Sequence, residues 1–159
     1  MTYVILIYIG TATIWWVKRS MLLPCEVAVK SVIPAIRSAI ARELTQSYGL
    51  KQKEVAQLLG VTQTAVSKYT RHARGAVLEV KEVDDAQPVL KETVFSLANG
   101  DMNKYELAEK LCLVCKIIRR KGLMCKLCAI SDPDIDKQQC IVCPSNDKPK
   151  RQEQKTKPE

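Results

Sequence analysis

Six of the seven cysteines form three C-x-x-C pairs in the C-terminal half of the chain: Cys112/Cys115, Cys125/Cys128 and Cys140/Cys143. A pair with this spacing presents two thiolates to one ion, and two such pairs complete the tetrahedral sulfur site of a zinc ion. Four thiolates hold an iron–sulfur cluster equally well. The spacing therefore predicts a cysteine-ligated metal centre, with an iron–sulfur cluster or zinc as the bound group.

Such a centre needs only four of the six thiolates, so one pair is spare or takes part in redox exchange. We expect the ligands to lie outside the helical pattern, in loops that can bend round an ion. These are Cys125, Cys128, Cys140 and Cys143, with Cys112 and Cys115 as the alternates. Two other interpretations are inert buried thiols and disulfides, which a reducing cytoplasm disfavours. The seventh cysteine, Cys25, has an apolar context and is expected in the core.

A second group of side chains that could bind a ligand is polar and basic, and it lies between positions 52 and 74. A DNA-recognition helix enters the major groove with its N-terminal residues on base edges. Gln63 can take an adenine bidentately, and Lys68 can reach a guanine or a phosphate. The predicted DNA-binding residues are Gln52, Lys53, Thr62, Gln63, Thr64, Ser67, Lys68, Arg71 and Arg74.

Two short helices joined by a tight turn would position these side chains. The pattern predicts one helix over residues 51–59 and a second over 62–74, for which Thr62 is a good N-cap. Gly60 permits the positive φ that a sharp turn between them needs. Ala56 must be small because the two helices cross there. The expected buried faces comprise Val55, Ala56, Leu59, Ala65, Val66 and Tyr69.

A further helix is predicted before this pair, over residues 34–48. Pro34 suits its first turn, where the missing N–H costs nothing. Ile36, Ile40 and Leu44 recur at helical spacing and form one apolar stripe. Gly49 is typical of the residue that follows a helix C-terminus.

The segment with Gln52 and Gln63 at the starts of its two short helices resembles the helix-turn-helix of lambda-repressor-like regulators, the XRE family. In that family one such glutamine contacts the DNA backbone and supports the other, which reads a base. Residues 22–75 as a whole are similar to archaeal predicted transcriptional regulators of the XRE type, some of which append a short cysteine-bearing region. The resemblance implies a transcriptional regulator that binds double-stranded DNA in a prokaryotic cytoplasm.

Charge and composition agree with a polyanionic partner. The 159 residues carry a formal net charge of +8, which favours nucleic acid or an anionic surface as a partner. Residues 50–74 hold five basic and one acidic side chain. The chain lacks a Ser/His/Asp set, a glycine-rich phosphate loop and the βαβ pattern of a thioredoxin-like thiol-redox enzyme, so we expect no enzyme. His72, the one histidine, is expected to be a phosphate contact or a solvated cap.

Two helices are predicted in the C-terminal half, over residues 88–99 and 103–121. The first carries an apolar stripe, and the second begins at a capping box of Asn103 and Glu106. One recognition helix reads few base pairs, so we expect a homodimer on half-sites about 34–36 Å apart, with these two helices as its surface. The stripes comprise Leu90, Val94, Leu97, Leu107, Leu111, Val114 and Ile118.

The two ends of the chain differ in character from the rest. Residues 1–17 hold no charged side chain and are at the short end of a membrane span. They are an artefactual or unimportant extension before Met21, a membrane anchor that leaves the remainder cytoplasmic, or an extra strand or helix packed on the domain. Residues 144–159 have no apolar side chain except proline and should form a disordered basic tail.

These observations together predict a mainly α fold, in which a lambda-repressor-like helix-turn-helix bundle precedes a short helical, cysteine-rich metal-binding region. The expected division is an apolar extension over 1–20, a DNA-binding domain over 21–75, an acidic or extended linker over 76–87, a cysteine-rich region over 88–143 and the tail. The expected function is sequence-specific regulation, with the metal as sensor or structural element. The alternatives are a zinc-containing adaptor of a transcription complex and a membrane-anchored regulator.

Overall fold

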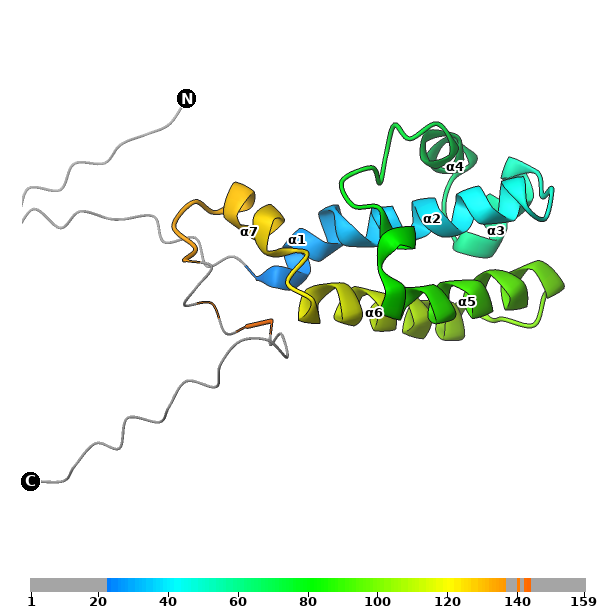
Figure 1. Ribbon diagram of the computed structural model, residues 1–159. Helices are drawn as coiled ribbons and strands as arrows, with labels where there is room; N and C mark the ends of the chain where they lie inside the picture. Colours follow the sequence, from blue (N-terminus) through cyan, green and yellow to red (C-terminus); the bar gives the residue numbers. More distant parts are fainter. Residues whose placement is uncertain (1–22, 137–139, 141, 144–159) are drawn as a thin grey trace, which may run out of the picture.

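The computed structural model describes residues 23–136, 140 and 142–143, and all regular structure within them is helical (Figure 1). The mainly α prediction is therefore confirmed. The elements are α1 (Pro24–Lys30), α2 (Val32–Gln46), α3 (Gln52–Leu59), α4 (Gln63–Thr70), the short 3₁₀ helices η1 (Val80–Glu82) and η2 (Asp84–Ala86), α5 (Gln87–Asn99), α6 (Lys104–Arg120) and α7 (Cys125–Ser131).

Helix α2 runs through the middle of the molecule and contacts α1, α3, α4, η1, α5 and α6 (Figure 1). The predicted stripe of Ile36, Ile40 and Leu44 is buried. Small residues on the other sides of the helix, such as Ala35 and Ala41, are buried as well. A helix that is apolar nearly all round must lie inside a core, and the small side chains allow several neighbours to approach α2 at once.

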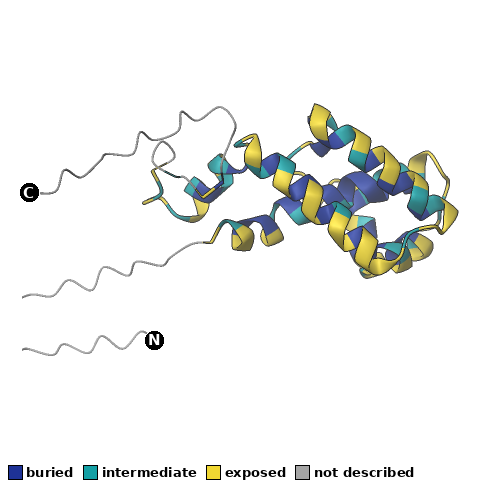
Figure 2. Cartoon of the chain, turned by 90° about the horizontal axis from the view of Figure 1, so that it is seen from below, coloured by how far each residue is buried: buried dark blue, intermediate teal, exposed yellow. Residues whose placement is uncertain are grey.

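Helices α5 and α6 form a pair that packs against α2, and both carry the predicted apolar stripes. The stripes are buried within the chain, so the prediction that they form a dimer surface is wrong. In Figure 2 the buried residues, in dark blue, lie between the helices, and the exposed residues, in yellow, lie on their outer faces. The Asn103 side chain accepts hydrogen bonds from the backbone N–H groups of Tyr105 and Glu106, and the Glu106 carboxylate accepts one from the Asn103 N–H. The predicted capping box is therefore present.

The segment between α4 and α5 differs from the expected extended or acidic linker. Its residues 80–86 form the two 3₁₀ helices, and Val80, Val83 and Ala86 are buried. Its charged side chains form ion pairs with both halves of the chain, Lys81 with Glu43 on α2 and Asp85 with Lys121 after α6. One continuous hydrophobic core thus crosses the predicted boundary between the DNA-binding and cysteine-rich regions.

Two predictions for the cysteines are wrong. Cys125 and Cys128 do not lie in a loop but in α7, which begins three residues after Gly122. Cys25 is not in the core: it lies exposed on α1. Helix α1 escaped prediction because its seven residues bury only Val27 and Ala28, too few to give a helical period.

None of the helices in the described ranges is both long and apolar enough to cross a membrane. Residues 1–20 lie outside the described residues, and so does every interpretation of the apolar extension. The predicted disordered tail over 144–159 lies outside them too.

Gly75 is required where the chain leaves α4 and passes over α2. Its φ is +78°, and a Cβ built on it would lie 2.5 Å from the Pro34 carbonyl oxygen and 2.8 Å from Ser38 Cβ. Gly75→Ala should lower the free energy of unfolding by about 1–2 kcal/mol for the left-handed backbone and by about 1–3 kcal/mol more for the overlap. Chemical denaturation followed by circular dichroism measures the loss.

Gly49 is the matched control for this substitution. Its φ is +67°, but nothing lies within 4 Å of a Cβ built there. Gly49→Ala should therefore lose only the backbone component, about 1–2 kcal/mol. Equal losses for the two variants would show that the contact of Gly75 with α2 is unimportant.

Candidate nucleic-acid interface and thiol cluster

Helices α3 and α4 pack on each other and on α2, and the turn between them has the predicted geometry. Gly60 adopts the left-handed conformation, with φ 61° and ψ 39°. The Val61 N–H donates to the Ala56 carbonyl at 3.0 Å and closes the turn. The Thr62 side chain then caps α4 by accepting a hydrogen bond from the Ala65 N–H at 3.2 Å. Local residue chemistry therefore fixes the angle between the two helices.

The inner face of α4 is firmly held. Ala65, Val66 and Tyr69 are buried, as are the predicted partners on α3. Tyr69 is only 1% exposed, and its backbone carbonyl accepts a hydrogen bond from Ser38 Oγ on α2 at 3.3 Å. These contacts fix α4 in one orientation, which a surface that reads a partner requires.

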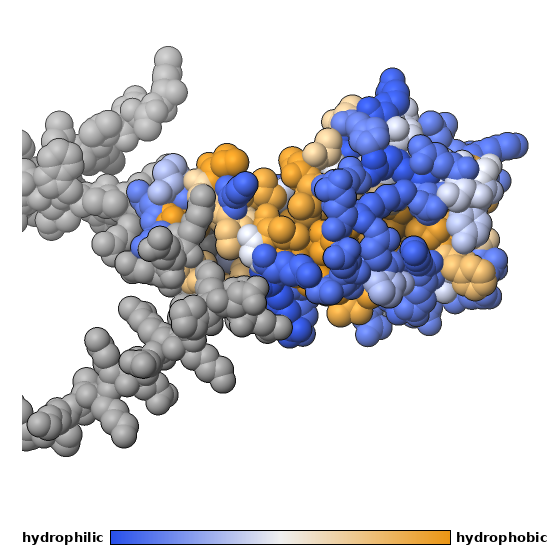
Figure 3. Space-filling view, in the orientation of Figure 1, coloured by the Kyte–Doolittle hydropathy of each residue, from blue (hydrophilic) through white to orange (hydrophobic). Residues whose placement is uncertain are grey.

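The outer face of α4 carries the predicted DNA-binding side chains, and the surface over α3 and α4 is largely hydrophilic (Figure 3). Gln63, Ser67 and Arg71 follow one another at four-residue intervals, and Thr64 and Lys68 lie beside them on the same helix face. Ser67 and Gln52 are half-buried. The exposed members of the set are Lys53, Thr62, Gln63, Thr64, Lys68, Arg71 and Arg74.

Two arginines at the C-terminal end of α4 are oriented by contacts of their own. Arg71 Nε donates to the Ser67 carbonyl at 3.2 Å, and its two Nη groups have no partner among the described residues. The Arg74 guanidinium lies 5.7 Å from the centroid of the Tyr69 ring, within reach of a cation–π interaction. Both arginines are exposed, and they lie at the C-terminal end of the helix that carries Gln63.

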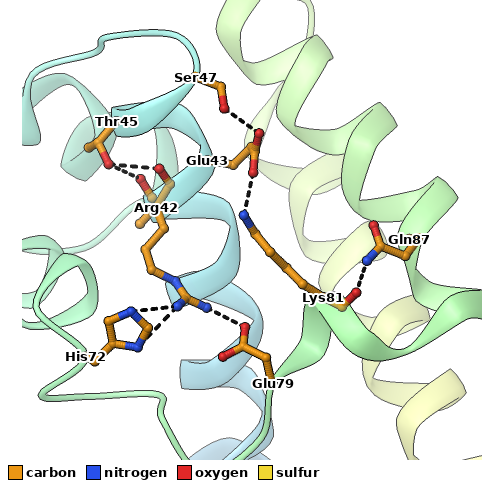
Figure 4. A network of polar contacts seen from close by, with 9 residues as sticks. Arg42, Glu43, Thr45, Ser47, His72, Glu79, Lys81 and Gln87 are labelled. Carbon is orange, nitrogen blue, oxygen red and sulfur yellow. Dashed lines mark hydrogen bonds and ion pairs between the residues drawn. The ribbon is translucent and has the colours of Figure 1, made fainter.

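His72 lies just beyond α4 and is exposed, with a positive φ of 57°. Arg42 Nη1 lies 2.8 Å from its Nε2 atom and 3.2 Å from Nδ1 (Figure 4). Arg42 Nη2 donates to Glu79 Oε1 at 2.7 Å. Arg42 thus joins the end of α4 to the segment before η1, a role that its position off the apolar stripe did not reveal.

Helices α1 and α7 are in contact at the end of the molecule where α6 terminates (Figure 1). The cysteines there are near enough to affect one another electrostatically: Cys115 is affected by Cys112, Cys25 and Cys143, and Cys128 by Cys143, Cys125 and Cys140. Arg119 lies among them: its Nε donates to Cys143 Sγ at 3.3 Å and its Nη1 to Cys25 Sγ at 3.5 Å. All seven are free thiols. We call the seven cysteines with Arg119 the thiol cluster.

Burial and neighbouring charges set the protonation of this cluster. Burial raises the pKa of the Cys115 thiol, and the nearby Arg119 charge partly opposes that rise. Burial, together with the neighbouring Cys143, Cys125 and Cys140 sulfurs, likewise raises the pKa of Cys128. At neutral pH these two buried groups are therefore neutral thiols, and a metal ion would have to displace their protons.

The donor chemistry of the cluster suits a soft metal, since sulfur is the only ligand type in it. The arrangement fits less well. Among the described residues, no three His, Cys, Asp or Glu side chains are close enough together to hold one ion. A metal would therefore have to draw its ligands together from α6, α7 and residues 140–143.

Comparison with known proteins identifies no relative: no family model, no curated protein and no solved structure matches the chain.

Proposed function

We propose that this chain is a sequence-specific, DNA-binding transcriptional regulator, with α3 and α4 acting as a lambda-repressor-like helix-turn-helix. The observation that carries the proposal is the two-sided character of α4. Its inner face is fully buried against α2 and α3, while its outer face presents a glutamine, a threonine and a lysine from the first turn onward. Such a helix suits the major groove.

Each outer side chain has a role that follows from its chemistry. Gln63, at the first position of α4, would bind an adenine bidentately, and Thr64 beside it would touch a thymine methyl group or a base edge. Lys68 would reach a guanine or a phosphate from the second turn. Ser67 is small enough to permit close approach of the helix to the bases.

Phosphate contacts would come from both ends of the unit. Gln52 and Lys53 lie in the first turn of α3, where free N–H groups and the helix dipole favour an anion. Arg71 and Arg74 lie beyond the last turn of α4 and would hold the DNA backbone there. Such contacts fix the position of a protein on the duplex but carry no sequence information.

A homodimer that places two α4 helices in successive major grooves stays part of the proposal. The stripes of α5 and α6 cannot form its interface, because they are buried within the chain. The large apolar side chains that these helices expose are Phe95, Tyr105 and Leu113. Sedimentation of the protein with DNA checks this part, and a monomer bound to one half-site would contradict it.

The thiol cluster favours a second function, a cysteine-ligated zinc or iron–sulfur centre that stabilises or senses. Helix α7 buries only Cys128, so little apolar packing holds it in place. A metal bound between α7 and residues 140–143 would supply that stability, because metal affinity becomes folding free energy where the free chain has no site. The reducing cytoplasm that suits such a centre is the proposed location.

The DNA-binding proposal is tested by the salt dependence of affinity for a short duplex of mixed sequence. Arg71→Ala should weaken binding to all sequences alike and reduce the slope of log K against log salt by about 1. Arg120, an exposed arginine at the end of α6, is the matched control, and Arg120→Ala should leave the slope unchanged. Absence of DNA binding by the parent protein would favour an adaptor role instead.

A further inference from the structure

A cavity of about 440 Å³ lies between α2 and α5, a volume within the range of small-molecule sites. Its apolar wall includes Ile40 from α2 and Leu90 and Val94 from α5. Tyr48 and Phe95 also line it, although 42% and 58% of their surfaces are exposed. Side chains that both line a cavity and face solvent lie at its opening, so the cavity has an aromatic rim.

The polar part of the lining carries more positive than negative charge. Lys81 Nζ lies 2.5 Å from Glu43 Oε2, and Ser47 Oγ donates to Glu43 Oε1 at 2.5 Å. The hydrogen bonds from Lys81 and Ser47 lower the pKa of Glu43, so this group is a carboxylate. Lys91 also lines the cavity, and the described residues form no ion pair with it. Two ammonium groups therefore face one carboxylate.

The same cavity is linked to the end of α4 through a short segment. Lys81 belongs to η1, and Glu79 immediately precedes η1. Glu79 binds Arg42, which contacts His72, while Lys81 binds Glu43, the residue next to Arg42 on α2 (Figure 4). Residues 79–81 are thus attached to α2 at two points, one beside the cavity and one beside α4.

We propose that this cavity binds a small amphiphilic carboxylate, and that the ligand regulates DNA affinity through residues 79–81. The hydrocarbon body would lie against the wall of α2 and α5, and the carboxylate would bind Lys91 and compete with Glu43 for Lys81. Loss of the Lys81–Glu43 ion pair would remove one of the two attachments of residues 79–81 to α2. The other attachment, Glu79–Arg42, is the one that contacts the end of α4 through His72. The regulatory part rests on the proposed DNA-binding function, whereas the binding site rests on the cavity alone.

Octanoate is a suitable probe, with octylamine as the control of equal chain length and opposite charge. Titration of the full chain, followed by amide chemical shifts, should show saturable octanoate binding at residues of α2 and α5. Octylamine should bind at least about tenfold more weakly, because the lining already carries excess positive charge. Equal binding of the two probes, or shifts that never saturate, would overturn the proposed site.

Two variants test the residues that recognise the probe. Lys91→Gln should weaken octanoate binding by about three- to fivefold, as expected for a partly exposed ion pair. Phe95→Ala should also weaken octanoate binding. Tyr105 is an exposed aromatic residue on α6 that does not line the cavity, so Tyr105→Ala should leave octanoate binding unchanged. Unchanged affinity in both Lys91→Gln and Phe95→Ala would overturn the assignment.

The regulatory part is tested by DNA affinity with and without octanoate, at matched sodium concentration. We expect octanoate to change the DNA affinity of the parent protein and to leave the DNA affinity of Glu79→Gln unchanged. This variant should still bind the probe, but it has lost the ion pair with Arg42. Octanoate binding without any change in DNA affinity would overturn the regulation and leave the site standing. If the parent binds no DNA, the proposed function and the regulation both fall, and the octanoate titration still decides the site.

Discussion

Tyr69→Ala is expected to lower the free energy of unfolding by about 3–5 kcal/mol, the usual cost of removing a fully buried aromatic side chain. Tyr69 is 1% exposed and is among the largest fully buried side chains of the described residues. The Tyr69 ring lies on the buried face of α4, and the Arg74 guanidinium lies over that ring. Its loss would leave a void where α4 is held, so we expect DNA affinity to fall as well.

Denaturant titration followed by circular dichroism measures this loss of stability. Tyr105→Ala is the matched control, because Tyr105 is 74% exposed on α6, and it should change stability by less than about 0.5 kcal/mol. A small domain is commonly stable by only about 5–15 kcal/mol, so Tyr69→Ala could unfold much of the population. Similar losses for the two variants would contradict the burial of the inner face of α4.

The full chain, purified without oxygen, should contain about one zinc ion or one iron–sulfur cluster per molecule, and joint replacement of Cys125 and Cys128 by serine should remove it. Structural zinc contributes on the order of 10 kcal/mol in small metal-dependent folds. We therefore expect α7, which buries only Cys128, to become sensitive to proteolysis in this variant. Elemental analysis and limited proteolysis are the measurements.

Cys25→Ser separates a metal ligand from a thiol that is merely close to the cluster. Cys25 lies on α1 and contacts Arg119, but it belongs to no C-x-x-C pair, so its loss should leave the metal content unchanged. Only trace metal in the parent protein would refute the centre. Metal retained after loss of Cys125 and Cys128 would refute the choice of ligands, and Cys112 and Cys115 would then be the expected ligands.

Much of this fold follows from short-range signals in the sequence. Gly60 and Thr62 determine the turn and the start of α4 through backbone conformation and capping, which depend on neighbours within four residues. The capping box of Asn103 and Glu106 likewise sets the start of α6. The outer face of α4 was predictable for the same reason, since helical spacing alone places Lys68 on the side of the helix opposite the buried Val66.

Contacts between distant residues could not be predicted in this way. Arg119 and Cys25 are 94 positions apart, and at the end of α6 the arginine had the ordinary appearance of a dipole partner. Lys81 and Glu79 looked like members of an acidic linker, yet each forms an ion pair with α2 across more than 35 positions. Such pairs depend on tertiary packing, which leaves no periodic pattern in either partner.

The central claim, that α4 reads DNA sequence, is tested most directly by the ratio of specific to non-specific affinity in Gln63→Ala. A duplex enriched by the parent from a randomised library provides the specific site, and the parent should prefer it by at least about 10³-fold. Gln57, an exposed glutamine on α3, is the matched control. We predict that Gln63→Ala lowers the ratio by about 5- to 150-fold, equivalent to 1–3 kcal/mol, and that Gln57→Ala leaves it unchanged. An unaltered ratio in Gln63→Ala, or a library from which the parent enriches no sequence, would contradict the claim.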